Sequence, residues 1–145
     1  MSEGDTSSDF QVFTIRRIRV LIADLDSHLT GLIRKTFDEK VILFKGEAIC
    51  FKWDEANSSE DVLKMVANNQ YNALLLDVDL VTNDGEPVTV SLRQRGYETP
   101  FGFLMTMKQV WPEMHFGGGG FPSLAKPCTL KDLVRFVLHL IEKGW

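Results

Sequence analysis

The chain has 145 residues, of which 44% are hydrophobic and 25% are charged. These values are typical of one globular domain with its own core, and they exclude a largely disordered chain. With 16 basic and 20 acidic residues, the net charge is −4. This balance gives no electrostatic reason to expect nucleic acid or an anionic membrane as the main partner.

The cysteine content and the N-terminus indicate the compartment. Cys50 and Cys128 lie far apart, and no CxxC or Cys/His spacing of the zinc-binding kind occurs. We therefore expect reduced thiols in a cytoplasmic protein, or in a nuclear one if the source is eukaryotic. No secretory signal is visible, and no apolar run approaches the length of a membrane span.

The first residues differ in composition from the rest of the chain. Residues 1–15 are predicted to form a flexible N-terminal extension, since most of them are polar and a core could bury few of them. Residues 16–145 are predicted to form one domain. Its first apolar run, residues 20–23, is too short for a helix and suits a strand that is buried on both faces.

Two amphipathic stretches follow, with a strand between them. Ser27 caps a predicted helix whose apolar residues recur at helical spacing. These residues are Leu29, Leu32, Ile33 and Phe37. Residues 40–47 look like an insertion to which no structure is assigned, and a second strand is predicted within residues 48–53. Ser58 and Asp61 form a capping box for the next predicted helix.

Three further strands are predicted from apolar runs in the second half of the chain. They lie at residues 73–76, 101–105 and 121–125, and the first of them ends in Asp77. Pro87 marks the start of a helix that Gly96 ends. A final amphipathic helix is capped by Thr129 and Asp132.

This alternation of strands and helices predicts the fold class. Because the crossover between parallel strands is right-handed, we expect an α/β fold with a five-stranded parallel sheet and helices on both faces. In such sheets, ligand sites form where loops leave the carboxyl ends of the strands.

Polar side chains follow four of the predicted strands. They are Asp24 and Asp26, Asp77 and Asp79, Thr106, and Lys126. Singly, each is also typical of a cap, a turn or a solvated side chain. Together they form a cluster in which carboxylates about 4 Å apart would repel by roughly 4 kcal/mol at an effective dielectric of 20. The cluster therefore calls for a cation, either a divalent metal or the ammonium group of Lys126.

The residue types of this cluster indicate phosphoryl transfer. Oxygen ligands without His or Cys favour Mg²⁺ over zinc, and the candidate ligands are Asp24 and Asp77, with Asp26 and the backbone of Asp79 as further candidates. A carboxylate beside Mg²⁺, with a hydroxyl and an ammonium group to hold phosphoryl oxygens, is an arrangement for phosphoryl transfer to Asp.

Over residues 19–141 the chain resembles the receiver domain of two-component response regulators. The resemblance rests on LIADLD at the first strand, LLLDVDLVTNDG at the third, FLMT at the fourth and LAKP at the fifth. It implies a flavodoxin-like receiver topology. By position, Asp77 resembles the phosphoacceptor, Asp24 and Asp26 an acidic pocket, and Thr106 and Lys126 the groups that contact the phosphoryl oxygens.

The resemblance also implies partners and a role. The partner would be a histidine kinase, a histidine phosphotransfer protein or another signalling protein, with no membrane and no direct nucleic-acid binding by this domain. The domain would not be an enzyme beyond self-catalysed phosphotransfer to Asp77 and its hydrolysis.

Three residues depart from the receiver pattern. Leu25 stands where the family has a second acid that binds Mg²⁺, Met107 where it has a small residue, and Ser123 where it has an aromatic switch. Residues 108–120, which should hold the fourth helix, contain Pro112 and four consecutive glycines and predict a short or partly unwound helix. We expect weak Mg²⁺ binding, and a pseudo-receiver that binds partners without phosphorylation is the alternative.

An enzymatic alternative rests on the first motif. LIADLDSHL resembles the first motif of haloacid dehalogenase-like phosphatases, in which one Asp is the nucleophile and the next is the acid/base. No acidic pair follows Lys126 at a strand end, and this interpretation leaves Asp77 unexplained. A dinucleotide site is less favoured still, because Asp and Leu follow the first strand where glycines would be needed.

Overall fold

The computed structural model describes residues 14–24, 39–106, 122–126 and 129–143, with the backbone alone at Thr106 and Lys126. The helix predicted after Ser27 and the stretch at residues 108–120 lie outside the described residues. None of the described helices is long and apolar enough to cross a membrane.

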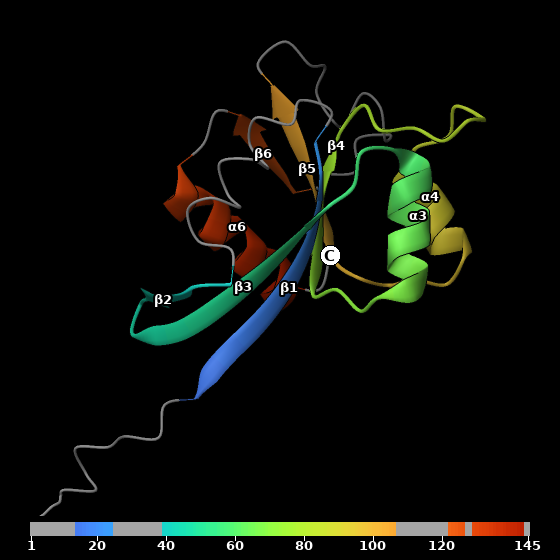
Figure 1. The fold of residues 1–145 in the computed structure, drawn as a ribbon. Coiled ribbons are helices and arrows are strands. Elements are labelled where there is room, and N and C mark those ends of the chain that lie inside the picture. The colour runs from blue at the N-terminus through green and yellow to red at the C-terminus, as the bar shows by residue number, and fades with distance from the viewer. Residues whose placement is uncertain (1–13, 25–38, 107–121, 127–128, 144–145) are drawn as a thin grey trace, which may run out of the picture.

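The strands form one six-stranded sheet in the order β2-β3-β1-β4-β5-β6 (Figure 1). Five of them are mutually parallel where they pair: β1 (Ile15–Ala23), β3 (Glu47–Glu55), β4 (Ala73–Asp77), β5 (Phe101–Thr106) and β6 (Ser123–Lys126). The sixth, β2 (Val41–Phe44), pairs antiparallel with β3. The prediction of a purely parallel sheet of five strands is therefore wrong in one respect, because an antiparallel edge strand makes the sheet mixed.

The edge strand arises from the stretch at residues 40–47 that had no assigned structure. Phe44 pairs with Glu47, so that Lys45 and Gly46 alone form the turn between β2 and β3. Both turn residues have positive φ, 51° at Lys45 and 79° at Gly46. Two-residue hairpin turns with positive φ at both positions match the right-handed twist of the strands they join.

Two strands differ from their predicted bounds. β1 begins at Ile15, well before the apolar run at residues 20–23, because it pairs with β3 from Ile15 onward. β6 begins at Ser123 rather than at residue 121. The strands predicted at residues 48–53, 73–76 and 101–105 are confirmed within a few residues.

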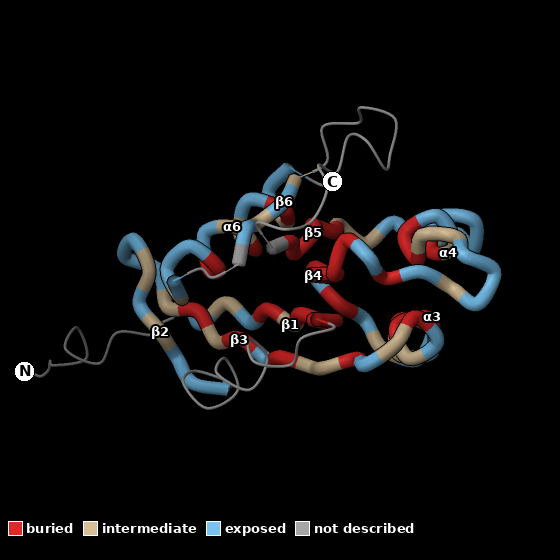
Figure 2. The backbone as a smooth tube through the Cα atoms, turned by 90° about the horizontal axis from the view of Figure 1, so that it is seen from above, coloured by how far each residue is buried: buried red, intermediate tan, exposed pale blue. Residues whose placement is uncertain are grey.

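Helices cover both faces of the sheet, as predicted. Helices α3 (Ser59–Asn68) and α4 (Val88–Gln94) lie on one side, and α6 (Leu130–Lys143) lies on the other (Figures 1 and 2). The predicted caps are present, since Oγ of Ser58 accepts from the N–H of Asp61 and Oγ1 of Thr129 accepts from the N–H of Asp132, both at 3.1 Å. In a capping box the carboxylate of Asp61 would accept a hydrogen bond from the N–H of Ser58. Here Oδ2 of Asp61 accepts from the N–H of Asn57 instead.

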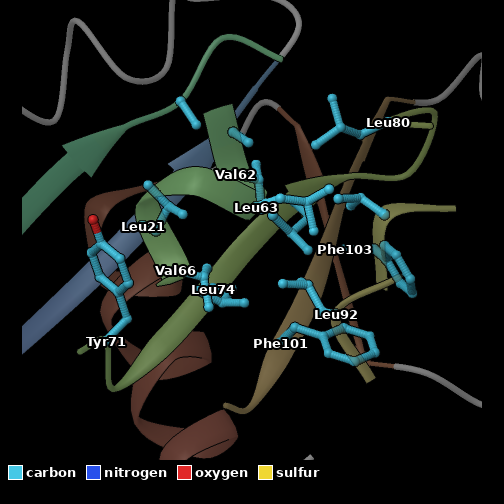
Figure 3. Close-up of a cluster of buried hydrophobic side chains, with 14 of the residues drawn as sticks. Leu21, Val62, Leu63, Val66, Tyr71, Leu74, Leu80, Leu92, Phe101 and Phe103 are labelled. Carbon is cyan, nitrogen blue, oxygen red and sulfur yellow. The ribbon is translucent and has the colours of Figure 1, made fainter. Parts of the chain in front are cut away.

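The core lies in two layers, one on each face of the sheet. Alternate residues of the central strands supply them, so that Leu74 and Leu76 face α3 and α4 while Leu75 faces α6. Figure 3 shows the first layer, in which Leu21 and Leu74 meet Val62 and Val66 of α3. Buried residues are concentrated in β1, β4 and β5 (Figure 2), which keeps the central strands and their carboxyl ends in fixed positions.

Candidate functional site

Two carboxylates lie next to each other at the carboxyl ends of β1 and β4. The register pairs Ala23 with Leu76, so the next residue on each strand brings Asp24 opposite Asp77. Neighbouring strands are about 4.8 Å apart, which places the two residues side by side. Both are buried, with 5% of Asp24 and 4% of Asp77 exposed. Buried carboxylates at this spacing need a cation or hydrogen-bond donors to offset their mutual repulsion.

The turn that follows β4 fixes the side chain of Asp77 and the backbone directly after it. The N–H of Asp79 donates to Oδ1 of Asp77 at 3.0 Å, and the N–H of Leu80 donates to its backbone carbonyl at the same distance. The N–H of Val78 donates to the carbonyl of Leu104 on β5. A carboxylate that accepts a bond from the N–H two residues on forms an Asx-turn, which orients its side chain.

The remaining strand-end residues lie along the same edge of the sheet. Thr106 and Lys126 are the last residues of β5 and β6, and the register pairs them directly. Asp77 pairs with Leu104, so β5 runs past the end of β4 before it reaches Thr106. The edge therefore carries Asp24, Asp77, Thr106 and Lys126 in the order of adjacent strands β1, β4, β5 and β6.

The other predicted site residues fall into two groups. Asp26, Leu25 and Met107 lie outside the described residues. Asp79 is exposed directly after the strand end, and Ser123 is exposed at the start of β6.

The donor chemistry of this edge fits a hard cation. No group of three or more His, Cys, Asp or Glu side chains gathers in a metal-binding arrangement within the described ranges, which leave out Asp26. Mg²⁺, however, is commonly held by one or two carboxylates together with several waters. Asp24 and Asp77 supply such a pair of adjacent, buried carboxylates.

A second polar cluster, which the sequence analysis missed, joins β1, β3 and the start of β4. Nε and Nη2 of Arg19 donate to Oδ2 of Asp54 at 3.0 and 2.7 Å. The hydroxyl of Tyr71 donates to the same oxygen at 2.8 Å, and the Arg19 guanidinium lies 5.1 Å from the centre of the Tyr71 ring. Sequence spacing gives no signal for this cluster, because its members are brought together only by strand pairing.

The cluster perturbs the acidity of both of its titratable acids. Burial would raise the pKa of Asp54, but hydrogen bonds from Tyr71 and Arg19, together with the positive charges of Arg19 and Lys52, outweigh it and hold that pKa below its usual value. Burial, and then the hydrogen bond to the Asp54 carboxylate and its charge, raise the pKa of Tyr71. Tyr71 begins the segment that leads into β4, so this cluster lies at the opposite end of β4 from Asp77 and stabilises the sheet.

Comparison with known proteins gives a fold and no sequence family. No family model matches the chain, and no curated protein sequence matches it. Among solved structures, the receiver domain of the Francisella response regulator 1452 is 22% identical, with a TM-score of 0.64 over 88% of this chain and 99% of that one. A two-component response regulator from Clostridium difficile is 20% identical, with a TM-score of 0.59 over 87% and 97%.

A third structure agrees with these two. A response regulator from Desulfuromonas acetoxidans is 12% identical, with a TM-score of 0.64 over 88% of this chain and 99% of that chain. At such identities the similarity is one of fold. The chain has the fold of a response-regulator receiver domain, as the sequence resemblance indicated, with the antiparallel strand β2 at one edge of its sheet.

Proposed function

We propose that this chain is a receiver domain of two-component signalling in which Asp77 accepts a phosphoryl group from a phosphohistidine donor. The observation that carries the proposal is the line of Asp24, Asp77, Thr106 and Lys126 along four adjacent strand ends in a receiver fold. The donor would be a histidine kinase or a histidine phosphotransfer protein.

The transfer is a single displacement at phosphorus. A carboxylate oxygen of Asp77 attacks the phosphorus atom of the phosphohistidine and forms the P–O bond of an acyl phosphate. The P–N bond breaks, its electron pair stays on the imidazole nitrogen, and that nitrogen takes up a proton from solvent. The N–H of Asp79 holds the carboxylate in one orientation during the attack.

Charge compensation would come from the neighbouring strand ends. The Lys126 ammonium and the Thr106 hydroxyl would contact the transferred phosphoryl oxygens. Mg²⁺ would neutralise negative charge that develops on the phosphoryl group. Asp24 and Asp77 would hold it, with Asp26 and the backbone carbonyl of Asp79 as further oxygen donors. Leu25 supplies no oxygen, so the metal would be held weakly.

A pseudo-receiver is the second candidate. The departures at Leu25, Met107 and Ser123 favour it, because each replaces a residue type that the receiver pattern uses for metal binding, access or switching. In that case the same fold would bind a signalling partner in one conformation. The phosphatase interpretation has less support, since Asp132 lies in the first turn of α6, where its carboxylate accepts from the N–H of Thr129 as a cap.

A small phosphodonor distinguishes the candidates. The protein is incubated with acetyl phosphate, with and without Mg²⁺, and its intact mass is measured. Phosphotransfer to Asp77 predicts the addition of one phosphoryl group that depends on Mg²⁺ and is absent from Asp77→Asn. A parent protein that gains no mass would be a pseudo-receiver, and steady release of phosphate from many turnovers would indicate a phosphatase.

A further inference from the structure

The antiparallel strand β2 forms one edge of the sheet. It pairs with β3 on one side, and in the part of the chain that the structure describes no strand pairs with its other side. The two-residue turn makes Phe44 and Glu47 a hydrogen-bonded pair, and the alternation of an antiparallel ladder then turns the backbone groups of Val41 and Leu43 away from β3. An edge of this kind can accept another strand.

The side chains of β2 are unusually apolar for a strand edge. Leu43 is 81% exposed and Val41 is 53% exposed, while Ile42 and Phe44 turn to the other face and pack against the core under α6. Natural edge strands commonly carry charges or proline that discourage pairing. Within its four residues β2 carries neither, and the strand lies at the outer margin of the sheet (Figure 2).

A groove runs beside this edge, between β2 and α6. Its volume is about 570 Å³. The apolar part of its lining comes from Ile42 and Phe44 of β2 and from Leu130 and Val134 of α6. Leu43 lines it too, which makes the groove continuous with the open edge.

Among the residues that the structure describes, the charged residues of the groove all have one sign. Lys45, Lys131 and Arg135 line it, and none of the described lining residues is acidic. The chain as a whole has a net charge of −4, so this basic cluster departs from the average of the protein. Lys131 and Arg135 are exposed on α6, and the Lys45 ammonium lies 5.7 Å from the centre of the Phe44 ring.

We propose that the edge of β2 and this groove bind an extended acidic segment of a partner protein, which adds to the sheet as a seventh strand beside β2. Strand addition supplies the affinity through backbone hydrogen bonds. Alternate side chains of the added strand fall on the α6 side, where apolar groups contact Ile42 and Val134 and carboxylates contact Lys131 and Arg135. This site does not involve Asp77 and is independent of the proposed phosphotransfer.

A second copy of the chain fits the edge less well. Antiparallel pairing of β2 with its symmetry mate would place Lys131 and Arg135 of both copies on the same face of the joined sheet, near the two-fold axis. Like charges held close together in this way are unfavourable, and specific interfaces avoid them. The charge of the groove therefore favours an acidic segment over another basic one.

The test uses a synthetic peptide of Thr-Asp-Thr-Val repeats, in which one face of the extended strand carries both aspartate and valine. It is titrated into the full chain and followed by NMR amide shifts. The proposal predicts saturable shifts at β2 and α6. Lys131→Glu combined with Arg135→Glu should weaken binding at least tenfold. Lys64→Glu combined with Arg95→Glu makes the same change in net charge at exposed positions on the α3 and α4 side, and it should leave the affinity nearly unchanged.

Four results would overturn the proposal. Equal binding of the same peptide with its backbone amides N-methylated would show that no strand is added. Equal weakening by both pairs of charge reversals, or no saturable binding at millimolar peptide, would show that the groove is not an acidic-segment site. A concentration-dependent dimer in sedimentation, with amide shifts at β2, would assign the edge to a second copy.

Discussion

The backbone N–H of Asp79 donates a 3.0 Å hydrogen bond to Oδ1 of Asp77, while the Asp79 residue itself is exposed. The turn after β4 thus orients the proposed phosphoacceptor through its backbone. This relationship separates the roles of two acids that stand two positions apart in the sequence, one buried at the strand end and one at the surface.

Replacement of Asp79 by alanine should therefore have a small effect on phosphorylation. Asp79→Ala keeps the backbone N–H, and the loss of an exposed charge is worth at most about 1 kcal/mol, or about fivefold in rate. The measurement is the initial rate of labelling by acetyl phosphate. Complete loss of labelling in Asp79→Ala, with Asp77→Asn still labelled, would make Asp79 the acceptor.

Restoring an acid at position 25 should tighten metal binding. Leu25→Asp adds a carboxylate oxygen next to Asp24, and we expect Mg²⁺ affinity to rise by roughly tenfold or more, about 1.4 kcal/mol. The increase in melting temperature on adding Mg²⁺ should be small for the parent and larger for the variant. Leu25→Asn, which offers a neutral oxygen, is the matched control.

The opposite result would assign the ligand role to another residue. If the parent already binds Mg²⁺ tightly and Leu25→Asp changes nothing, Asp26 supplies the missing carboxylate. Asp26→Asn would then abolish binding.

The sequence predicted the parts of the fold that depend on local patterns. The run at residues 73–76 is apolar throughout, and all four side chains are fully buried in β4, because a central strand has core on both faces. The caps at Ser58 and Thr129 were predictable because a cap depends only on residues three positions apart. The strand-end acids Asp24 and Asp77 were found by the same reasoning, since each directly follows an apolar run.

The features that the sequence did not predict depend on backbone conformation or on distant residues. Lys45 has a positive φ in the β2–β3 turn, a position at which Asn, Asp or Gly is the usual residue. Because lysine stands there, the sequence did not indicate a hairpin. The first half of β1 is a strand because it pairs with β3 from Ile15 onward, although Arg16, Arg17 and Arg19 interrupt its apolar pattern. Asp54 and Tyr71 meet Arg19 only through the sheet.

Removal of the Tyr71 hydroxyl should destabilise the sheet. Tyr71→Phe deletes the 2.8 Å hydrogen bond to Oδ2 of Asp54 and should lower the free energy of unfolding by about 1–2 kcal/mol near neutral pH. Urea unfolding measures this loss. A change indistinguishable from zero would mean that water replaces the hydroxyl at no cost.

The same cluster predicts a pH dependence with a definite sign. The pKa of Asp54 is lowered in the folded state, so its contribution is present above its unfolded pKa of about 3.9 and is lost as the pH falls below that value. The pKa of Tyr71 is raised, so its contribution is present below about pH 10 and is lost as the pH rises above it. Tyr71→Phe should therefore lose less stability than the parent between about pH 10 and 11, with Tyr97→Phe as the control.

Gly102 provides a test of the packing between β5 and α6. A methyl group at this position would lie 2.5 Å from Cζ of Phe136 and 3.0 Å from Cδ1 of Leu140. Gly102→Ala should therefore lower the free energy of unfolding by about 1–3 kcal/mol. Combined with Phe136→Leu, the cost should be less than the sum of the two single changes by at least about 0.5 kcal/mol. Strict additivity would show that the cost of Gly102→Ala does not come from contact with the Phe136 ring.

The assignment of Asp77 can be tested at the level of the single residue by reducing the phosphorylated protein with borohydride. Reduction converts a phosphorylated aspartate to homoserine, and peptide mass mapping then locates the modified position. After treatment with acetyl phosphate and Mg²⁺, homoserine should appear at position 77 alone and should be missing from Asp77→Asn. Homoserine at Asp24, or at any aspartate other than Asp77, would contradict the proposed site, and its absence from the whole chain would contradict phosphotransfer itself.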